Sequence, residues 1–272
     1  MSRHRNLSAR GTVLRAAIHI FVVLALGGGA TLLTLRAFDR LGQAETPEAA
    51  VNGDGTSAHQ QEALFDRNAT LLVITDSMGG GIGDGTIKRW PDVLADNMHW
   101  NVVVDAMGAR GFLPTDASNV GVPRPVPPFI DALKYDADTY RADYIIVDGG
   151  RNDLGKDPDR FAPAYDEYMT ALRSYYPQAK IISLVPSYIT PQRAELYEAN
   201  SAAVRQSAEK VGAYVMDPFA EGWFENIDLA PLLWTDGVHL NGAGAEYYAQ
   251  EIVDGMRRLG LVSDSESVQG AR

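Results

Sequence analysis

The sequence contains a serine and an Asp-x-x-His pair of the types that perform nucleophilic catalysis. Asp236 and His239 stand three residues apart in the stretch WTDGVHLNGAG, and Ser77 lies far upstream in TDSMGGGIGDG. A serine hydroxyl is a weak nucleophile until a base removes its proton, and an imidazole held by a carboxylate can be that base. Alternative interpretations of these residues are a metal site or helix caps.

The metal and cofactor alternatives find little support around His239. The chain has no cysteine, no HExxH motif and no second histidine at a suitable position, so we expect no metal site. The glycines of residues 79–85 fit neither a dinucleotide fingerprint nor a Walker loop, and we therefore expect no cofactor. The helix-cap interpretation suits Asn241 better than Asp236, because Asn241 directly precedes a long helical pattern.

Alternating strand and helix patterns must position these residues. Five short apolar runs rich in β-branched residues are typical of strands buried on both faces, and segments of helical period separate them. This alternation predicts a three-layer α/β/α sandwich around a five-stranded parallel sheet. The expected strands are 70–75, 100–106, 143–150, 180–186 and 213–218, and the expected helices are 87–97, 128–134, 161–176, 191–211 and 242–259.

The candidate residues follow the carboxyl ends of the strands, where open parallel sheets bind ligands. Ser77 follows the first strand, Gly108 and Gly111 follow the second, and Asn152 follows the third. The Asp-x-x-His pair lies beyond the fifth strand. Each residue alone is explained equally well as a cap, an Asx turn or a glycine turn. Their joint occurrence in this order is the specific signal.

In this order the residues resemble the SGNH hydrolases, the GDSL-type esterase and lipase superfamily. Residues 75–77, Thr-Asp-Ser, stand where that family has Gly-Asp-Ser, so that Thr75 is a departure. Residues 150–153 match Gly-x-Asn-Asp, and residues 236–239 match Asp-x-x-His. The second block lacks the asparagine frequent in the family. The resemblance covers residues 70–259.

The resemblance implies both a fold and a site. The implied sheet order is 2-1-3-4-5, as in flavodoxin, which brings the ends of strands one, two and three together. The implied catalytic triad is Ser77, His239 and Asp236. The implied oxyanion donors are the backbone N–H groups of Ser77 and Gly111, with Gly108 as the rival glycine, and the side-chain amide of Asn152. The implied supporting residues are Asp76, Gly150 and Asp153.

The implied reaction is hydrolysis of acyl esters by a serine esterase. The sequence has no lid helix or long apolar insertion, which favours short acyl chains such as acetyl. Substrates of this kind are envelope glycans, lipids or small esters. Two alternatives stay open: an O-acyltransferase of the same fold that moves the acyl group to a sugar hydroxyl, and a non-catalytic acyl- or glycan-binding module.

The N-terminal segment predicts a membrane anchor. Residues 1–15 are basic, and residues 16–35 form a run of 20 residues without formal charge, about the length that spans a bilayer. The arginines before this run favour an N-terminus in the cytoplasm and a catalytic domain outside. A cleaved signal peptide, and hence secretion, is the alternative.

The rest of the chain divides into three parts. Residues 36–68 are expected to be a flexible tether, residues 69–261 the hydrolase domain and residues 262–272 a disordered tail. The net charge is −11 although the first 40 residues hold six arginines and a single acidic residue. The body of the protein is therefore strongly acidic, which excludes nucleic acid as an expected partner. The sequence makes no prediction of the oligomeric state.

Overall fold

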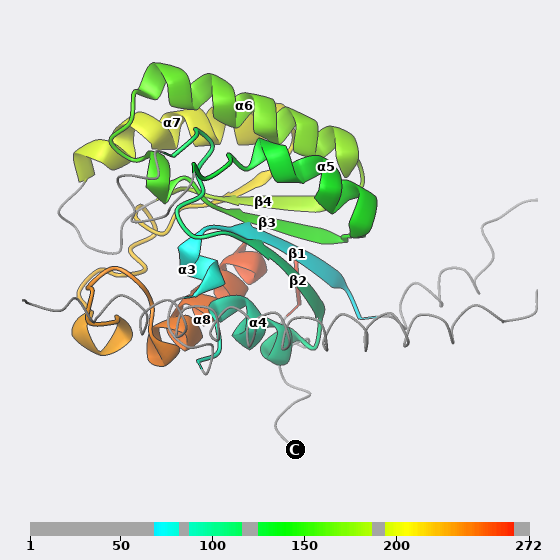
Figure 1. Ribbon diagram of the computed structural model, residues 1–272. Helices are drawn as coiled ribbons and strands as arrows, with labels where there is room; N and C mark the ends of the chain where they lie inside the picture. The colour runs from blue at the N-terminus through cyan, green and yellow to red at the C-terminus, as the bar shows by residue number, and fades with distance from the viewer. Residues whose placement is uncertain (1–67, 82–86, 116–124, 187–193, 264–272) are drawn as a thin grey trace, which may run out of the picture. The chain divides into compact units, whose positions relative to one another are not determined.

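The structure of the chain is a computed structural model, which describes residues 68–81, 87–115, 125–186 and 194–263 (Figure 1). These residues belong to one unit of the chain, Ala58–Arg272. The expected anchor at 16–35, nearly all of the expected tether and most of the expected tail lie outside the described residues. Within the described ranges no helix is long and apolar enough to cross a membrane.

Five parallel strands form the centre of the fold. They are β1 (Thr70–Thr75), β2 (Asn101–Ala106), β3 (Tyr144–Asp148), β4 (Lys180–Leu184) and β5 (Tyr214–Met216). Their order is β2-β1-β3-β4-β5, and every neighbouring pair is parallel. This confirms the predicted fold class and sheet order.

The strand register brings the expected site loops together. Thr75, the last residue of β1, pairs with Ala106 at the end of β2 and with Asp148 at the end of β3. The three chain segments that leave these strands therefore start side by side, at the carboxyl ends of the strands. Ser77, Gly111 and Asn152 lie on these segments.

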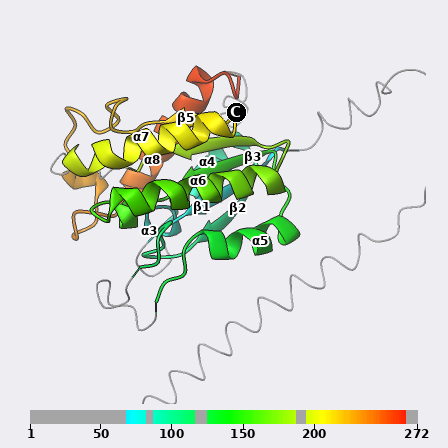
Figure 2. The same cartoon turned by 90° about the horizontal axis from the view of Figure 1, so that it is seen from above.

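Helices cover both faces of the sheet (Figures 1 and 2). On one face lie α4 (Trp90–Met98) and α8 (Gly242–Arg258), and on the other lie α5 (Ile130–Thr139), α6 (Pro158–Tyr175) and α7 (Ala194–Lys210). Side chains of β1 alternate between the two resulting cores. Leu71 and Val73 pack with α4 and α8, while Leu72 and Ile74 pack with α5 and α6.

The structure differs from the sequence prediction at strands β2 and β5 and at three short helices. We expected all strands to be buried on both faces, but β2 and β5 are only partly buried, because each is an outermost strand of the sheet with one neighbour. The short helices α3 (Ser77–Gly80), η2 (Arg151–Asp153) and η4 (Ala230–Leu232) were not predicted. Such short turns carry too few residues for a hydrophobic period.

Candidate active site

Ser77 is the first residue of α3, on a tight turn directly after β1. Asp76 caps this helix, because its Oδ1 accepts the Met78 N–H at 2.9 Å. The hydroxyl of Thr75 accepts the Gly79 N–H at 3.2 Å. A Cβ on Gly79 would lie 2.6 Å from the Thr75 Cγ2 and Oγ1 atoms. Thr75 therefore fits this turn because residue 79 is a glycine.

A chain of hydrogen bonds joins Ser77 to the Asp-x-x-His pair. His239 Nε2 lies 2.8 Å from Ser77 Oγ, and His239 Nδ1 lies 2.8 Å from Asp236 Oδ2. Asp236 and His239 lie in one turn, which is about 160 positions from Ser77 in the sequence. This geometry allows the imidazole to take the serine proton while the carboxylate fixes its tautomer.

Backbone hydrogen bonds hold Asp236 and His239 in one turn. Asp236 Oδ1 accepts the N–H groups of Val238 at 2.9 Å and His239 at 3.0 Å. Partial desolvation raises the pKa of Asp236, but these N–H groups and the His239 ring outweigh it and lower the pKa below its usual value. The carboxylate is therefore ionised at neutral pH.

The turn that carries His239 is anchored to the start of α8. Trp234 N–H donates to the His239 carbonyl at 2.8 Å, and Gly237 has a φ of 68°. Asn241 caps α8 by accepting the Gly244 N–H at 3.1 Å, as the sequence predicted. Its side-chain amide also donates to the carbonyls of Pro231 and Leu233. Asn241 thus fixes the loop before the helix as well as the helix itself.

Two backbone N–H groups of the loops that leave β1 and β2 have no protein acceptor among the described residues. They are the N–H groups of Ser77 and Gly111. Gly111 is buried, whereas the rival Gly108 is exposed and has nothing within 4 Å of an added Cβ. The geometry favours Gly111 as a candidate oxyanion donor.

The side-chain amide of Asn152 links the two loops that carry these N–H groups. Its nitrogen lies 2.9 Å from the Arg110 carbonyl and 3.2 Å from Asp76 Oδ2. The Arg110 carbonyl belongs to the same peptide unit as the Gly111 N–H. Both amide hydrogens are thus directed to protein oxygens.

Asp153 is a fully buried carboxylate beneath the Gly111 loop. It accepts the N–H groups of Phe112 at 2.7 Å and Leu113 at 3.1 Å, and Lys156 Nζ at 3.0 Å. Gly150 precedes it with a φ of 101°, a conformation that favours glycine. These contacts join the third strand's turn to the second strand's loop.

Sequence reasoning assigned no role to a buried charged group next to the site. Arg151 donates to Asp148 Oδ1 at 2.6 Å and to the Tyr248 hydroxyl at 2.9 Å, and it lies 3.8 Å from Asp76 Oδ1. A signal was present in the sequence, because an arginine follows three residues after an aspartate that ends a buried strand. Such a charge must find a partner.

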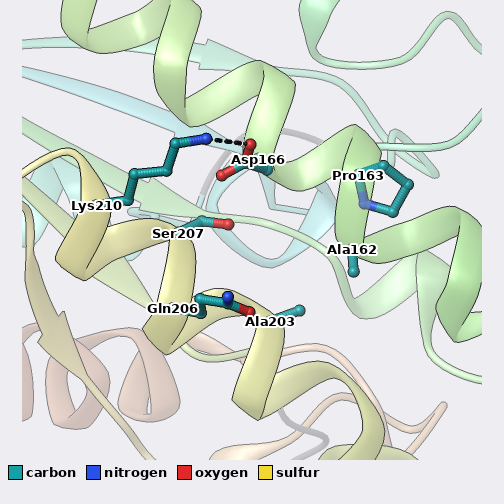
Figure 3. Close-up of a pocket in the computed structure, with 7 residues that line it drawn as sticks. All are labelled: Ala162, Pro163, Asp166, Ala203, Gln206, Ser207 and Lys210. Carbon is teal, nitrogen blue, oxygen red and sulfur yellow. Dashed lines mark hydrogen bonds and ion pairs between the residues drawn. The ribbon is translucent and has the colours of Figure 1, made fainter.

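A separate hollow lies between α6 and α7 (Figure 3). It has a volume of about 270 Å³, and the residues that line it include Lys210 and Asp166, which form an ion pair of 2.6 Å. None of the candidate site residues lines it. In the described part of the chain no group of three or more His, Cys, Asp or Glu residues is placed to hold a metal ion.

Two sequence comparisons relate the chain to known proteins. The sequence model of the GDSL-like lipase/acylhydrolase family matches residues 74–247. The GDSL lipase Rv0518 of Mycobacterium tuberculosis is 30% identical over 185 residues, which are 65% of this chain and 74% of that protein.

Solved esterase structures share the fold. The carbohydrate acetylesterase Est24 of Sinorhizobium meliloti superposes with a TM-score of 0.54 at 16% identity, over 71% of this chain and 100% of that one. The esterase EstA of a Pseudoalteromonas species gives a TM-score of 0.56 at 14% identity, over 71% and 98%.

Proposed function

The chain belongs to the GDSL-like lipase/acylhydrolase family and is a carboxylic ester hydrolase, and on that premise we propose that Ser77, His239 and Asp236 are its catalytic triad. The observation that carries this proposal is the hydrogen-bonded chain from Ser77 Oγ through the His239 ring to Asp236 Oδ2, with 2.8 Å at both steps.

In the proposed mechanism Ser77 Oγ attacks the ester carbonyl. His239 Nε2 takes the hydroxyl proton and then delivers it to the leaving alcohol, while Asp236 stabilises the imidazolium. The acyl group is now bound to Ser77. Water, deprotonated by the same imidazole, attacks this acyl-enzyme and releases the acid together with the free serine.

We propose that the oxyanion is stabilised by the N–H groups of Ser77 and Gly111 and by the Asn152 amide. The two N–H groups need no rearrangement, because they have no acceptor among the described residues. Each such donor contributes about 3–4 kcal/mol to stabilising the transition state. Asp76, Gly150 and Asp153 act as supports of these loops.

We propose short acyl esters, such as acetyl esters of envelope glycans, as the substrates, acted on outside the cytoplasmic membrane. The fold shared with a carbohydrate acetylesterase supports this class. The uncharged run at 16–35 supports a single-pass anchor. The domain starts at the amino end of β1, at Thr70, and Ser77 follows the carboxyl end of the same strand. The site and the start of the domain therefore lie at opposite ends of the strands.

A fluorophosphonate probe tests the triad in the full-length chain. We expect labelling at Ser77, no labelling of Ser77→Ala, and strongly reduced labelling of His239→Ala. Turnover of an aryl acetate should fall about 10⁴-fold or more in both variants, with more residual activity in Asp236→Asn. A folded Ser77→Ala protein with the wild-type rate would refute the proposal. A new ester formed with added sugar would indicate acyl transfer instead of hydrolysis.

A further inference from the structure

A cluster of buried charges lies directly behind the nucleophile turn. Asp76, Asp148 and Arg151 are all less than a tenth exposed. The guanidinium of Arg151 donates to Asp148 Oδ1 and to the Tyr248 hydroxyl, and it lies 3.8 Å from Asp76 Oδ1. A buried guanidinium is costly unless it is paired, so these contacts are needed for the fold to accept it.

The cluster connects the three elements that carry the proposed active site. Asp76 belongs to the turn of Ser77, and Asp148 ends β3, immediately before the turn of Asn152. Tyr248 lies on α8, the helix that follows His239. Arg151 is in contact with all three elements.

Asp76 connects this cluster to the proposed active site through two hydrogen bonds. Its Oδ1 accepts the Met78 N–H of the nucleophile helix, and its Oδ2 accepts the amide of Asn152. Both bonds need Asp76 as an acceptor. If Oδ2 carried a proton, it would present a donor to the Asn152 nitrogen, which is also a donor, and the amide would turn away.

The charge state of Asp76 depends on its neighbours. Burial raises the pKa of Asp76 to about 6, while the Arg151 guanidinium opposes this increase. The nearby Asp148 carboxylate acts in the same direction as burial, whereas the Met78 N–H and the His239 ring lower the pKa, and the value of about 6 results from all these contributions together. Tyr248 faces the same cluster from α8 through its bonds to Arg151 and Asp148.

We propose that Arg151 is a positioning residue for catalysis: it keeps Asp76 negatively charged, and Asp76 in turn orients the Ser77 turn and the Asn152 amide. The inference rests on the proposed function of Ser77. Arg151 occupies the variable position of the Gly-x-Asn-Asp block. Its proposed role is electrostatic and involves no contact with substrate.

The first test replaces the charge with a neutral side chain of similar length. We expect Arg151→Met to lower kcat for an aryl acetate about a hundredfold near neutral pH, with KM changed by less than about threefold, because the misplaced groups act on the transition state. Without the guanidinium, Asp76 ionises only at higher pH. The kcat deficit should therefore shrink as the pH is raised to about 9, and Arg151→Lys should recover part of the loss.

A matched control separates positioning from general stability. Arg173 also donates several hydrogen bonds, to the carbonyls of Val211, Ala179 and Gly212 among others, but at the opposite edge of the sheet. We expect Arg173→Met to lower the melting temperature and to leave kcat and its pH profile unchanged. An Arg151→Met protein that is folded and has wild-type kcat at every pH would overturn the inference.

The Asp76→Asn variant is a second test, which remains informative if Arg151→Met does not fold. We expect a loss of kcat that does not recover at high pH, because the residue no longer titrates, and little additional loss when Arg151→Met is combined with it. Wild-type kcat in Asp76→Asn would overturn the inference. Fluorophosphonate labelling of Ser77 in the wild-type chain distinguishes these outcomes from failure of the triad itself.

Discussion

Gly111 occupies a position where a methyl group has no room. A Cβ there would lie 2.6 Å from both carboxylate oxygens of Asp153, and Asp153 cannot withdraw because it holds the N–H groups of Phe112 and Leu113. The loop of Gly111 and the turn of Asp153 can therefore approach this closely only because residue 111 has no side chain.

From this contact we expect Gly111→Ala to displace the loop and to lower kcat about a hundred- to a thousandfold, as loss of one oxyanion donor does. Gly108→Ala is the comparison, because an added Cβ at that position meets nothing within 4 Å. Its kcat should stay close to the wild-type value. Steady-state kinetics on an aryl acetate measure both variants, and the opposite ranking would make Gly108 the donor.

At the scale of the element, the turn from β1 into α3 is built on a complementary pair. Thr75 fills the space above Gly79, and its hydroxyl accepts the Gly79 N–H. Thr75 stands where the family has the glycine of Gly-Asp-Ser. The turn can hold the threonine side chain because Gly79, four residues later, has no side chain of its own. The departure at Thr75 is thus compensated within the same element.

This complementarity predicts a non-additive mutant cycle. We expect Gly79→Ala to destabilise the protein by about 1–3 kcal/mol, because its Cβ overlaps the Thr75 side chain. Thr75→Gly should relieve that overlap, so that the double variant is more stable than the sum of the single changes implies. Chemical denaturation of the four proteins measures the coupling. Additive effects would show that the two side chains do not interact.

The same short elements explain where sequence prediction reached its limit. The five strands and the long helices were predicted, because each carries a hydrophobic period or an uninterrupted apolar run. Their bounds lie within about three residues of the prediction except at α5, which was expected to end at residue 134 and ends at Thr139. The α3 and η2 turns were not predicted, since a single turn of helix is set by caps and neighbouring loops. Asp76 makes such a cap on α3.

Across the whole molecule, buried carboxyls set how stability depends on pH. Burial raises the pKa of Asp76 to about 6, and burial together with the neighbouring Asp105 raises the pKa of Asp136 to about 7. Their value in the unfolded chain is near 3.8. Between these values the folded state binds more protons than the unfolded state. The stabilisation from these two groups is therefore complete below about pH 4 and is lost as the pH rises through 6 and 7.

Other carboxyls act in the opposite direction. The Arg89 side chain lowers the pKa of Asp92, and Lys210 lowers that of Asp166, so their stabilisation is lost as the pH falls below about 4. We expect the melting temperature to be highest near pH 4 and to decline as the pH rises from there to about 7. Asp136→Asn should flatten this decline between about pH 4 and pH 7. A melting temperature that rises steadily across that range would contradict this prediction.

The sequence by itself determined the strand order through a family resemblance, the chain order of Ser77, Asn152 and His239, and the acidic character of the domain. The chain order follows from local patterns, namely buried apolar runs with polar residues at their ends. The acidic character follows from composition, and the strand order is what the resemblance implies. It also predicted the cap at Asn241, which depends only on the residues beside it. The roles of the site residues and the N-terminal anchor stay predictions.

Only the tertiary structure decided which side chains meet. It brought the His239 ring to Ser77, tied Asn152 to Asp76 and the Arg110 carbonyl, and gathered Arg151 with Asp148 and Tyr248. These contacts join residues up to 162 positions apart. The physical reason is that the burial and the partners of a charge depend on the packing of several elements at once, which no local pattern encodes.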